Sequence, residues 1–188
     1  MDEPRPIIRF EATVTSKASP DVVYEILGDP STHLEWAGRQ APRQDFRLLT
    51  LDAPKGSASV GTRFVSTGAN SKDGSSTFHD ESIVTEATPP SLFAFVTESH
   101  LERKHRKTWE VRFVHRYEVH PNGAGSRITY TGSVYPVNYR PYWLHPLVRP
   151  MTRKLGNTYT TKHISNLSRM AEIVSTSAQK RILHSTDS

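Results

Sequence analysis

The middle of the chain contains six short segments in which apolar residues alternate with polar ones or dominate, and turn-forming residues separate them. A period of two is typical of β-strands that bury one face. The segments lie near residues 43–51, 60–67, 77–87, 92–99, 108–120 and 126–135. Strands joined by short turns pair antiparallel. The pattern therefore predicts a meander and restricts the chain to folds built around one antiparallel sheet.

A strand and two short helices are expected before the meander, and a long helix after it. Residues 7–16 alternate as a strand, and Ser19, Pro20 and Asp21 then form a typical helix start that Gly28 ends. A second short helix is expected over residues 31–36. After a proline-rich connector, residues 139–149, a long helix is expected from about Pro150 to Val174. Its apolar stripe contains Met151, Leu155, Tyr159, His163, Leu167, Met170 and Val174.

The segment around residue 113 has the clearest alternation. Phe113, His115 and Tyr117 share one face with other apolar residues, whereas charged residues occupy the opposite face. A turn of four residues after His120 would place His115 opposite Tyr130 on the next strand. A slip of one residue would mix the two faces, so the pattern excludes it.

Five short motifs, in this order and spacing, carry a resemblance to a known superfamily. They are residues 18–24 (ASPDVVY), 29–30 (DP), 34–36 (LEW), 60–64 (VGTRF) and 87–90 (ATPP). Together they resemble the helix-grip superfamily, which includes START lipid-transfer domains, birch-pollen-allergen-like proteins and polyketide cyclases/dehydrases. The resemblance implies an α+β fold in which a strongly curved antiparallel sheet of about seven strands wraps around a long C-terminal helix. It also implies a cavity between sheet and helix that binds apolar small molecules.

The expected organisation is a single domain. Residues 1–6 form a flexible N-terminus, residues 7–174 form the helix-grip domain, and residues 175–188 form a disordered tail. The connector over residues 139–149 is expected to cover the mouth of the cavity.

Aromatic and polar side chains on the predicted inner faces are the candidate ligand-binding residues. Large rings are also what a core between sheet and helix needs, so burial and ligand contact remain alternative readings for each. Gly156 is expected to give room for close helix packing or for a ligand. The candidates are Trp36, Phe64, Trp109, Phe113, His115, Tyr117, Tyr130, Leu155 and Tyr159.

His115 and Tyr117 are also the only catalytic candidates, as an acid/base pair in the cavity. The alternative is a core histidine whose hydrogen bonds are satisfied by Tyr130, the backbone or water. Asp80 and Glu98 lie in the middle of two strands and would be expected on exposed faces. No metal-binding motif is present, and neither a metal nor a cofactor is expected.

Charge and composition limit the partners. The chain carries a net charge of +5, with the basic excess after residue 138, and it contains no cysteine. Disulfide scaffolds and cysteine-based catalysis or metal sites are thereby excluded. The basic run over residues 100–107 has no interleaved aromatic residues, so nucleic-acid binding is not expected. The sequence has no candidate transmembrane segment, leaves peripheral membrane contact open, and fits a cytoplasmic protein.

Three functions follow from these observations. The first is binding of a small apolar or aromatic molecule, such as a lipid or polyketide, by a carrier or sensor. The second is a cofactor-independent cyclase or dehydratase that uses His115 and Tyr117. The third is a protein-interaction module that uses the basic loop and the final helix. The oligomeric state does not follow from the sequence.

Overall fold

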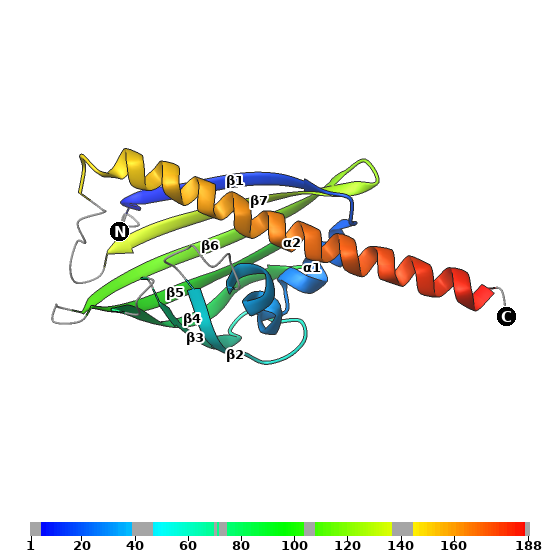
Figure 1. Cartoon of the computed structure of the whole chain (residues 1–188), viewed down its shortest axis with the longest axis horizontal. Helices are drawn as coiled ribbons and strands as arrows, with labels where there is room; N and C mark the ends of the chain where they lie inside the picture. Colours follow the sequence, from blue (N-terminus) through cyan, green and yellow to red (C-terminus); the bar gives the residue numbers. More distant parts are fainter. Residues whose placement is uncertain are drawn as a thin grey trace.

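The computed structural model describes residues 5–38, 47–69, 71, 75–103, 108–136 and 145–186, with side chains as far as residue 178. Strands dominate the first three quarters of the chain, and one long helix ends it (Figure 1). In chain order the elements are β1 (Ile8–Ser16), α1 (Pro20–Leu27), η1 (Pro30–Thr32), η2 (Leu34–Gly38), β2 (Arg47–Asp52), β3 (Arg63–Ala69), β4 (Ser76–Thr88), β5 (Leu92–Arg103), β6 (Trp109–Asn122), β7 (Gly125–Pro136) and α2 (Arg149–Thr186).

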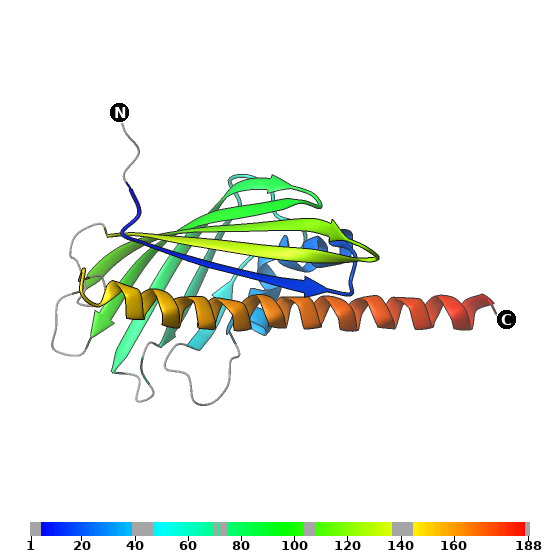
Figure 2. The same cartoon turned by 90° about the horizontal axis from the view of Figure 1, so that it is seen from above.

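The strands form one curled antiparallel sheet in the order β1-β7-β6-β5-β4-β3-β2. The meander runs from β2 to β7, and β1 closes it by pairing with β7. Figure 2 shows α2 lying along β1, with its C-terminal end extending beyond the sheet. The predicted α+β helix-grip architecture, with seven strands and a long C-terminal helix, is therefore confirmed.

The short helices after β1 follow the expected order but differ in detail. Ser19 stands at the N-cap position of α1, yet its side chain makes no capping hydrogen bond. Gly28 ends the helix as predicted, and its N–H donates to the Tyr24 carbonyl. The single helix expected over residues 31–36 is instead a 3₁₀ turn, η1, followed by a π-helical turn, η2. The Asp29 carboxylate accepts a hydrogen bond from the Ser31 N–H at 3.0 Å and so fixes the start of η1.

The hairpin between β6 and β7 is tighter than expected. Asn122 pairs with Gly125, so the turn contains two residues, and the first, Gly123, has a φ of 63°. The strands are therefore shifted by two residues from the predicted register, and His115 lies opposite Gly132 instead of Tyr130. A shift of two keeps every side chain on the same face of the sheet. The prediction of the register was wrong, whereas the prediction of the shared face was right.

The buried face of α2 differs from the predicted stripe. The buried residues are Thr160, Ile164, Leu167, Ser168 and Ala171. Most of these side chains are small, which lets the helix approach the sheet closely. The large apolar residues at the start of the predicted stripe instead face solvent, with exposed fractions of 61% for Met151 and 64% for Leu155.

The C-terminal part of α2 extends past the expected end at Val174 and reaches Thr186. No side chain between residues 172 and 178 is buried. Helical structure there depends on local interactions, because packing against the sheet has ended. Residues 175–186 of the predicted tail fall on this extension, and residues 187–188 lie outside the described residues.

Side chains of α2 bind the outer edge of β1. The Asn157 Oδ1 atom accepts a hydrogen bond from the Glu11 N–H at 3.1 Å, and a Glu172 carboxylate oxygen accepts one from the Lys17 N–H at 2.9 Å. Ser168 donates from its hydroxyl to the Thr15 carbonyl at 3.3 Å. These contacts satisfy backbone groups that an edge strand leaves without a partner strand.

Two clusters of buried residues form the core. The larger one lies where α1, η2 and the middle of α2 pack against the sheet, and it includes Trp36, Phe93, Ile128 and Ile164. The smaller one lies toward the opposite end of the strands, around Phe78, Leu101, Trp109, Val111 and Val134. The candidate site lies toward this end of the strands, between the inner face of the sheet and the first half of α2.

Candidate functional site

A cavity of about 420 Å³ lies between the inner face of the sheet and α2. Its walls come from β1, β4, β5, β6, β7 and α2. The lining residues are Phe10, Ser76, Phe78, Asp80, Thr97, Ser99, Leu101, Arg103, Trp109, Phe113, His115, Tyr130, Tyr159 and His163.

Strand periodicity explains why these residues meet. Within each strand the lining residues are separated by even numbers of positions, such as Phe78 and Asp80 in β4 or Phe113 and His115 in β6. Alternate side chains of a strand point to the same face, so residues an even number of positions apart can line the same wall. From α2, Tyr159 and His163 are four residues apart and share one helix face. Their rings lie 4.1 Å apart between centroids.

His115 and Tyr130 form the central polar contact of the site. The His115 Nδ1 atom lies 2.8 Å from the Tyr130 hydroxyl, and the His115 ring stacks on Phe95 with 4.5 Å between centroids. Gly132 makes this contact possible, because it lies directly opposite His115 and has no side chain. A Cβ atom at residue 132 would lie 2.5 Å from the Tyr130 hydroxyl. Tyr130 therefore reaches diagonally across Gly132 to its partner.

Burial keeps this part of the wall uncharged. It lowers the pKa of His115 to about 3, and the nearby His33 and His163 act in the same direction. Burial also lowers the pKa of His163 to about 4. The pKa of the Tyr130 hydroxyl is raised by burial, and so is that of Tyr159. All four side chains are consequently neutral near pH 7.

Asp80 places a carboxyl group on the same wall. Burial raises its pKa to about 6, against the opposing effects of a hydrogen bond from Ser99 and of the nearby His79. Its Oδ1 atom is shielded from water and has no hydrogen-bond partner among the described residues. Glu98, by contrast, lies on the outer face, where its carboxylate is 3.4 Å from Arg112. The prediction that both carboxylates are exposed was wrong for Asp80.

Five of the nine predicted ligand-binding residues line the cavity, and the other four lie elsewhere. Trp36, Phe64 and Tyr117 are buried in the larger core cluster, where the Trp36 and Tyr117 rings are 6.0 Å apart. Leu155 faces solvent. The residues that line the cavity are Trp109, Phe113, His115, Tyr130 and Tyr159.

Two lining residues outside that set could have been found from the sequence. Asp80 has the same parity along β4 as Phe78, Ser82 and Val84, which are all buried. A polar residue on an otherwise buried strand face is a signal in its own right. His163 follows Tyr159 by one helical turn, which places both on the same side of α2.

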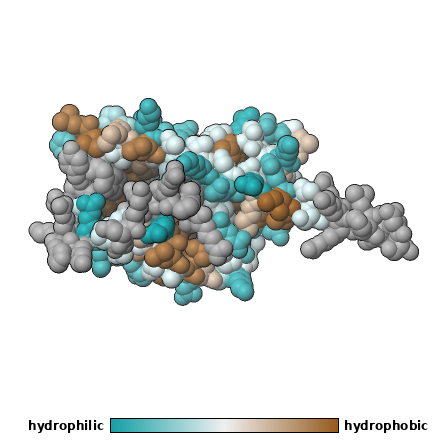
Figure 3. Space-filling model, in the orientation of Figure 1, coloured by the Kyte–Doolittle hydropathy of each residue, from teal (hydrophilic) through white to brown (hydrophobic). Residues whose placement is uncertain are grey.

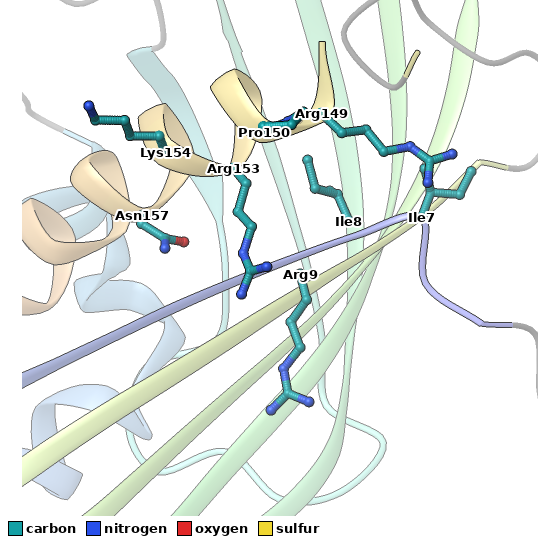
Figure 4. A pocket seen from close by; sticks show the side chains of 8 residues that line it. All are labelled: Ile7, Ile8, Arg9, Arg149, Pro150, Arg153, Lys154 and Asn157. Atoms are coloured by element: carbon teal, nitrogen blue, oxygen red, sulfur yellow. The ribbon is translucent and has the colours of Figure 1, made fainter. Parts of the chain in front are cut away.

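A second hollow, of about 740 Å³, lies outside the cavity between β1 and the start of α2 (Figure 4). Its cationic residues are Arg9, Arg149, Arg153 and Lys154. Their charged ends point in different directions in Figure 4, and the Arg9 guanidinium lies 4.0 Å from the Glu11 carboxylate. The hollow is a basic surface groove whose charges do not converge on one point.

The outer surface is mixed in character. Figure 3 shows apolar patches separated by hydrophilic residues, with one patch at the end of the molecule where α2 begins. Exposed large apolar side chains near this end include Leu147 and Met151. Most of the predicted lid, and residues 104–107 of the basic loop, lie outside the described residues. In the described part of the chain, no group of three His, Asp or Glu side chains is arranged to hold a metal ion.

A curled antiparallel sheet that encloses one long helix, with a cavity between the two, defines the helix-grip class of folds. The chain belongs to the polyketide cyclase / dehydrase and lipid transport family, whose sequence model matches residues 8–172. No functionally curated protein matches the chain significantly. Among the described residues, no helix is both long enough and apolar enough to cross a bilayer.

Solved structures of bacterial proteins share this fold. A conserved protein from Geobacillus kaustophilus is 12% identical, with a TM-score of 0.61 over 87% of this chain and 95% of that one. A protein from Rhodobacter sphaeroides is 13% identical, with a TM-score of 0.60 over 92% and 97% of the two chains. A protein from Chromobacterium violaceum is 12% identical, with a TM-score of 0.58 over 87% and 96%. At these identities the likeness concerns the fold alone.

Proposed function

We propose that the protein binds a small apolar or aromatic molecule in the cavity between the sheet and α2, as a carrier or sensor. The observation that carries this proposal is the cavity itself, whose volume of about 420 Å³ is in the range of small-molecule sites. Rings of Phe10, Trp109 and Phe113 supply apolar wall, and His115 and Tyr130 supply neutral hydrogen-bonding groups. This combination suits a mostly apolar ligand that carries one or two polar atoms.

Burial of apolar surface supplies the driving force for such binding. A ligand that buries about 300 Å² of apolar surface gains roughly 7–8 kcal/mol. Loss of translational and rotational freedom costs at least about 4 kcal/mol of this gain. Ring contacts and one hydrogen bond to His115 or Tyr130 are then sufficient for affinity near the micromolar range, about −8 kcal/mol.

The alternative of a cyclase or dehydratase has weaker support. A general base works best with a pKa near the working pH, and burial lowers the pKa of His115 to about 3. Tyr117, the other proposed acid/base residue, packs in the core and does not line the cavity. The interaction module also remains a prediction, because half of its basic loop lies outside the described residues. The cytoplasmic location likewise stays a prediction.

Two variants on the same strand test the proposal. Ser99→Phe places a ring inside the cavity, whereas Glu98→Phe places the same ring on the outer face of β5. Nile red, a neutral dye whose fluorescence rises in apolar surroundings, serves as the probe. We expect wild type and Glu98→Phe to bind the dye and Ser99→Phe to bind it at least about tenfold more weakly, with folding checked by circular dichroism.

Native mass spectrometry of the purified protein provides a second readout. A co-purified apolar molecule that is released on denaturation, and is missing from Ser99→Phe, would support the proposal. Dye binding that is the same in both variants would place the dye outside the cavity and contradict it. Absence of dye binding in the folded wild-type protein would do so as well.

A further inference from the structure

The cavity wall carries a carboxyl group, that of Asp80, which forms no ion pair with a described residue. Asp80 is the only acidic residue among the described residues that line the cavity. The one guanidinium there belongs to Arg103, and it lies over the Trp109 ring, 4.7 Å from the ring centroid. No ion pair within 4.0 Å links Asp80 to any described residue, and its Oδ1 atom accepts no hydrogen bond from them.

The histidines and tyrosines that line the cavity do not neutralise this charge near pH 7. Burial lowers the pKa of His115 to about 3 and that of His163 to about 4, so both imidazoles are uncharged. Tyr130 and Tyr159 keep their protons because burial raises the pKa of each hydroxyl. His79 precedes Asp80 on β4, but its side chain is half exposed and lies 3.7 Å from the Glu81 carboxylate.

Ionisation of Asp80 persists nevertheless. Its pKa is raised only to about 6, since Ser99 donates a hydrogen bond that favours the charged form. A carboxylate therefore predominates at pH 7, although it is buried. A buried charge is strongly disfavoured unless it is paired, so a cation that enters the cavity gains an interaction that the empty protein lacks.

Aromatic rings line the same cavity as Asp80. Phe10, Trp109, Phe113, Tyr130 and Tyr159 belong to the same wall as Asp80. The faces of aromatic rings attract ammonium groups, and their apolar surface accommodates the uncharged remainder of a ligand. A cavity lined by one carboxylate and several rings is thus complementary to a molecule with one ammonium group on an apolar or aromatic body.

We propose that the cavity binds small aromatic or apolar amines in their protonated form, with the ammonium group paired to the Asp80 carboxylate. This inference rests on the proposed function, because it names the chemical class of ligand for the same cavity. The Ser99 hydroxyl orients the carboxylate, and the rings hold the apolar part of the amine.

Two probes with the same ring system test the inference. They are 1-naphthylmethylamine, which is protonated at neutral pH, and 1-naphthalenemethanol, which is neutral. Displacement of Nile red is measured for wild type, for Asp80→Asn and for Glu98→Gln. The last variant is a matched control, because it removes one carboxylate from the outer face of the neighbouring strand.

In the wild type, the amine is expected to bind at least about tenfold more tightly than the alcohol. Asp80→Asn is expected to abolish this preference without weakening the alcohol, whereas Glu98→Gln is expected to retain it. Equal binding of the two probes to the wild type would overturn the inference and leave the proposed function standing. A preference that survives in Asp80→Asn would overturn it too. Failure to bind Nile red or either probe would remove the proposed function, and this inference with it.

A second variant covers the case in which Asp80→Asn does not fold. Ser99→Ala removes the hydrogen bond that favours the ionised carboxyl group, so the pKa of Asp80 should rise. The amine preference is then expected to weaken at about pH 7 and to return at about pH 8, where alkyl amines remain protonated. An amine preference in Ser99→Ala that equals that of the wild type at both pH values would contradict the pairing with Asp80. Among the described residues, the titratable or charged groups that line the cavity with Asp80 are Arg103, His115, Tyr130, Tyr159 and His163, and His79 precedes Asp80 on β4.

Discussion

Acidification is expected to destabilise the fold through His33, which is 5% exposed in the larger core cluster. Its ring lies edge-on to Trp36, 4.8 Å between centroids, and to Phe64 at 5.6 Å. The Nε2 atom lies 3.1 Å from the Leu27 carbonyl oxygen. A carbonyl oxygen only accepts, so the ring proton sits on Nε2 and the neutral imidazole satisfies this contact.

Burial lowers the pKa of His33 from 6.5 to about 4, although the Leu27 carbonyl and Asp29 both favour the charged form. The unfolded chain therefore binds a proton below pH 6.5 that the folded protein excludes until about pH 4. The contribution of His33 to stability is complete above pH 6.5 and is lost as the pH falls through this window. Each pH unit below 6.5 lowers the free energy of unfolding by about 1.4 kcal/mol, so the loss amounts to about 2 kcal/mol at about pH 5.

Urea unfolding of wild type and of His33→Gln at about pH 7 and about pH 5 measures this effect. The glutamine amide can donate to the Leu27 carbonyl but does not titrate. We expect the wild type to lose about 2 kcal/mol more than the variant between the two pH values. His115 and His163 respond in the same direction and Asp80 in the opposite one, but all three are common to both proteins. An identical pH dependence in the two proteins would refute the reasoning.

Two further substitutions test the packing of α2. Gly156→Ala improves helix propensity by up to about 1 kcal/mol, but its Cβ atom would collide with the Phe10 ring. We expect the free energy of unfolding, measured in urea, to fall by about 1–2 kcal/mol. Phe10→Ala in the same chain should relieve this loss. Stabilisation by Gly156→Ala alone would disprove the contact. Ile164→Ala, in the core, is expected to lower the free energy of unfolding by about 2–5 kcal/mol. Ile173 is 59% exposed, so Ile173→Ala should change it by no more than about 0.5 kcal/mol. Equal effects of the two substitutions would contradict the burial of this face of α2.

Alternation along the strands was sufficient to predict which residues face inward. It correctly placed Phe113, His115 and Tyr117 on one face of β6, since the pleat fixes parity whatever the register. It could not separate the cavity from the core, because both lie on that face. His115 reaches the cavity, while Tyr117, two residues further along, lies beneath α1 and η2.

The orientation of α2 was harder to predict. A stripe of large apolar residues beginning at Met151 indicated the wrong face for the first turns. Close packing of α2 against β1 requires small residues at the contact, and a search for apolar residues at helical spacing does not pick out small ones. Gly156 shows this requirement, because any side chain there would meet Phe10. Asp80 was missed for a similar reason, since its polarity suggested exposure although its strand position indicated burial.

The hydrogen bonds between α2 and β1 have a consequence for self-association. An edge strand with free backbone groups is a template on which another copy of the chain can add a strand. Asn157 and Glu172 already engage the outward N–H groups of Glu11 and Lys17. The helix thus covers β1, the longer of the two edge strands of the sheet, and blocks the addition of another strand. The other edge, β2, is six residues long and interrupted by a register shift, so it too is a poor template for amyloid-like growth.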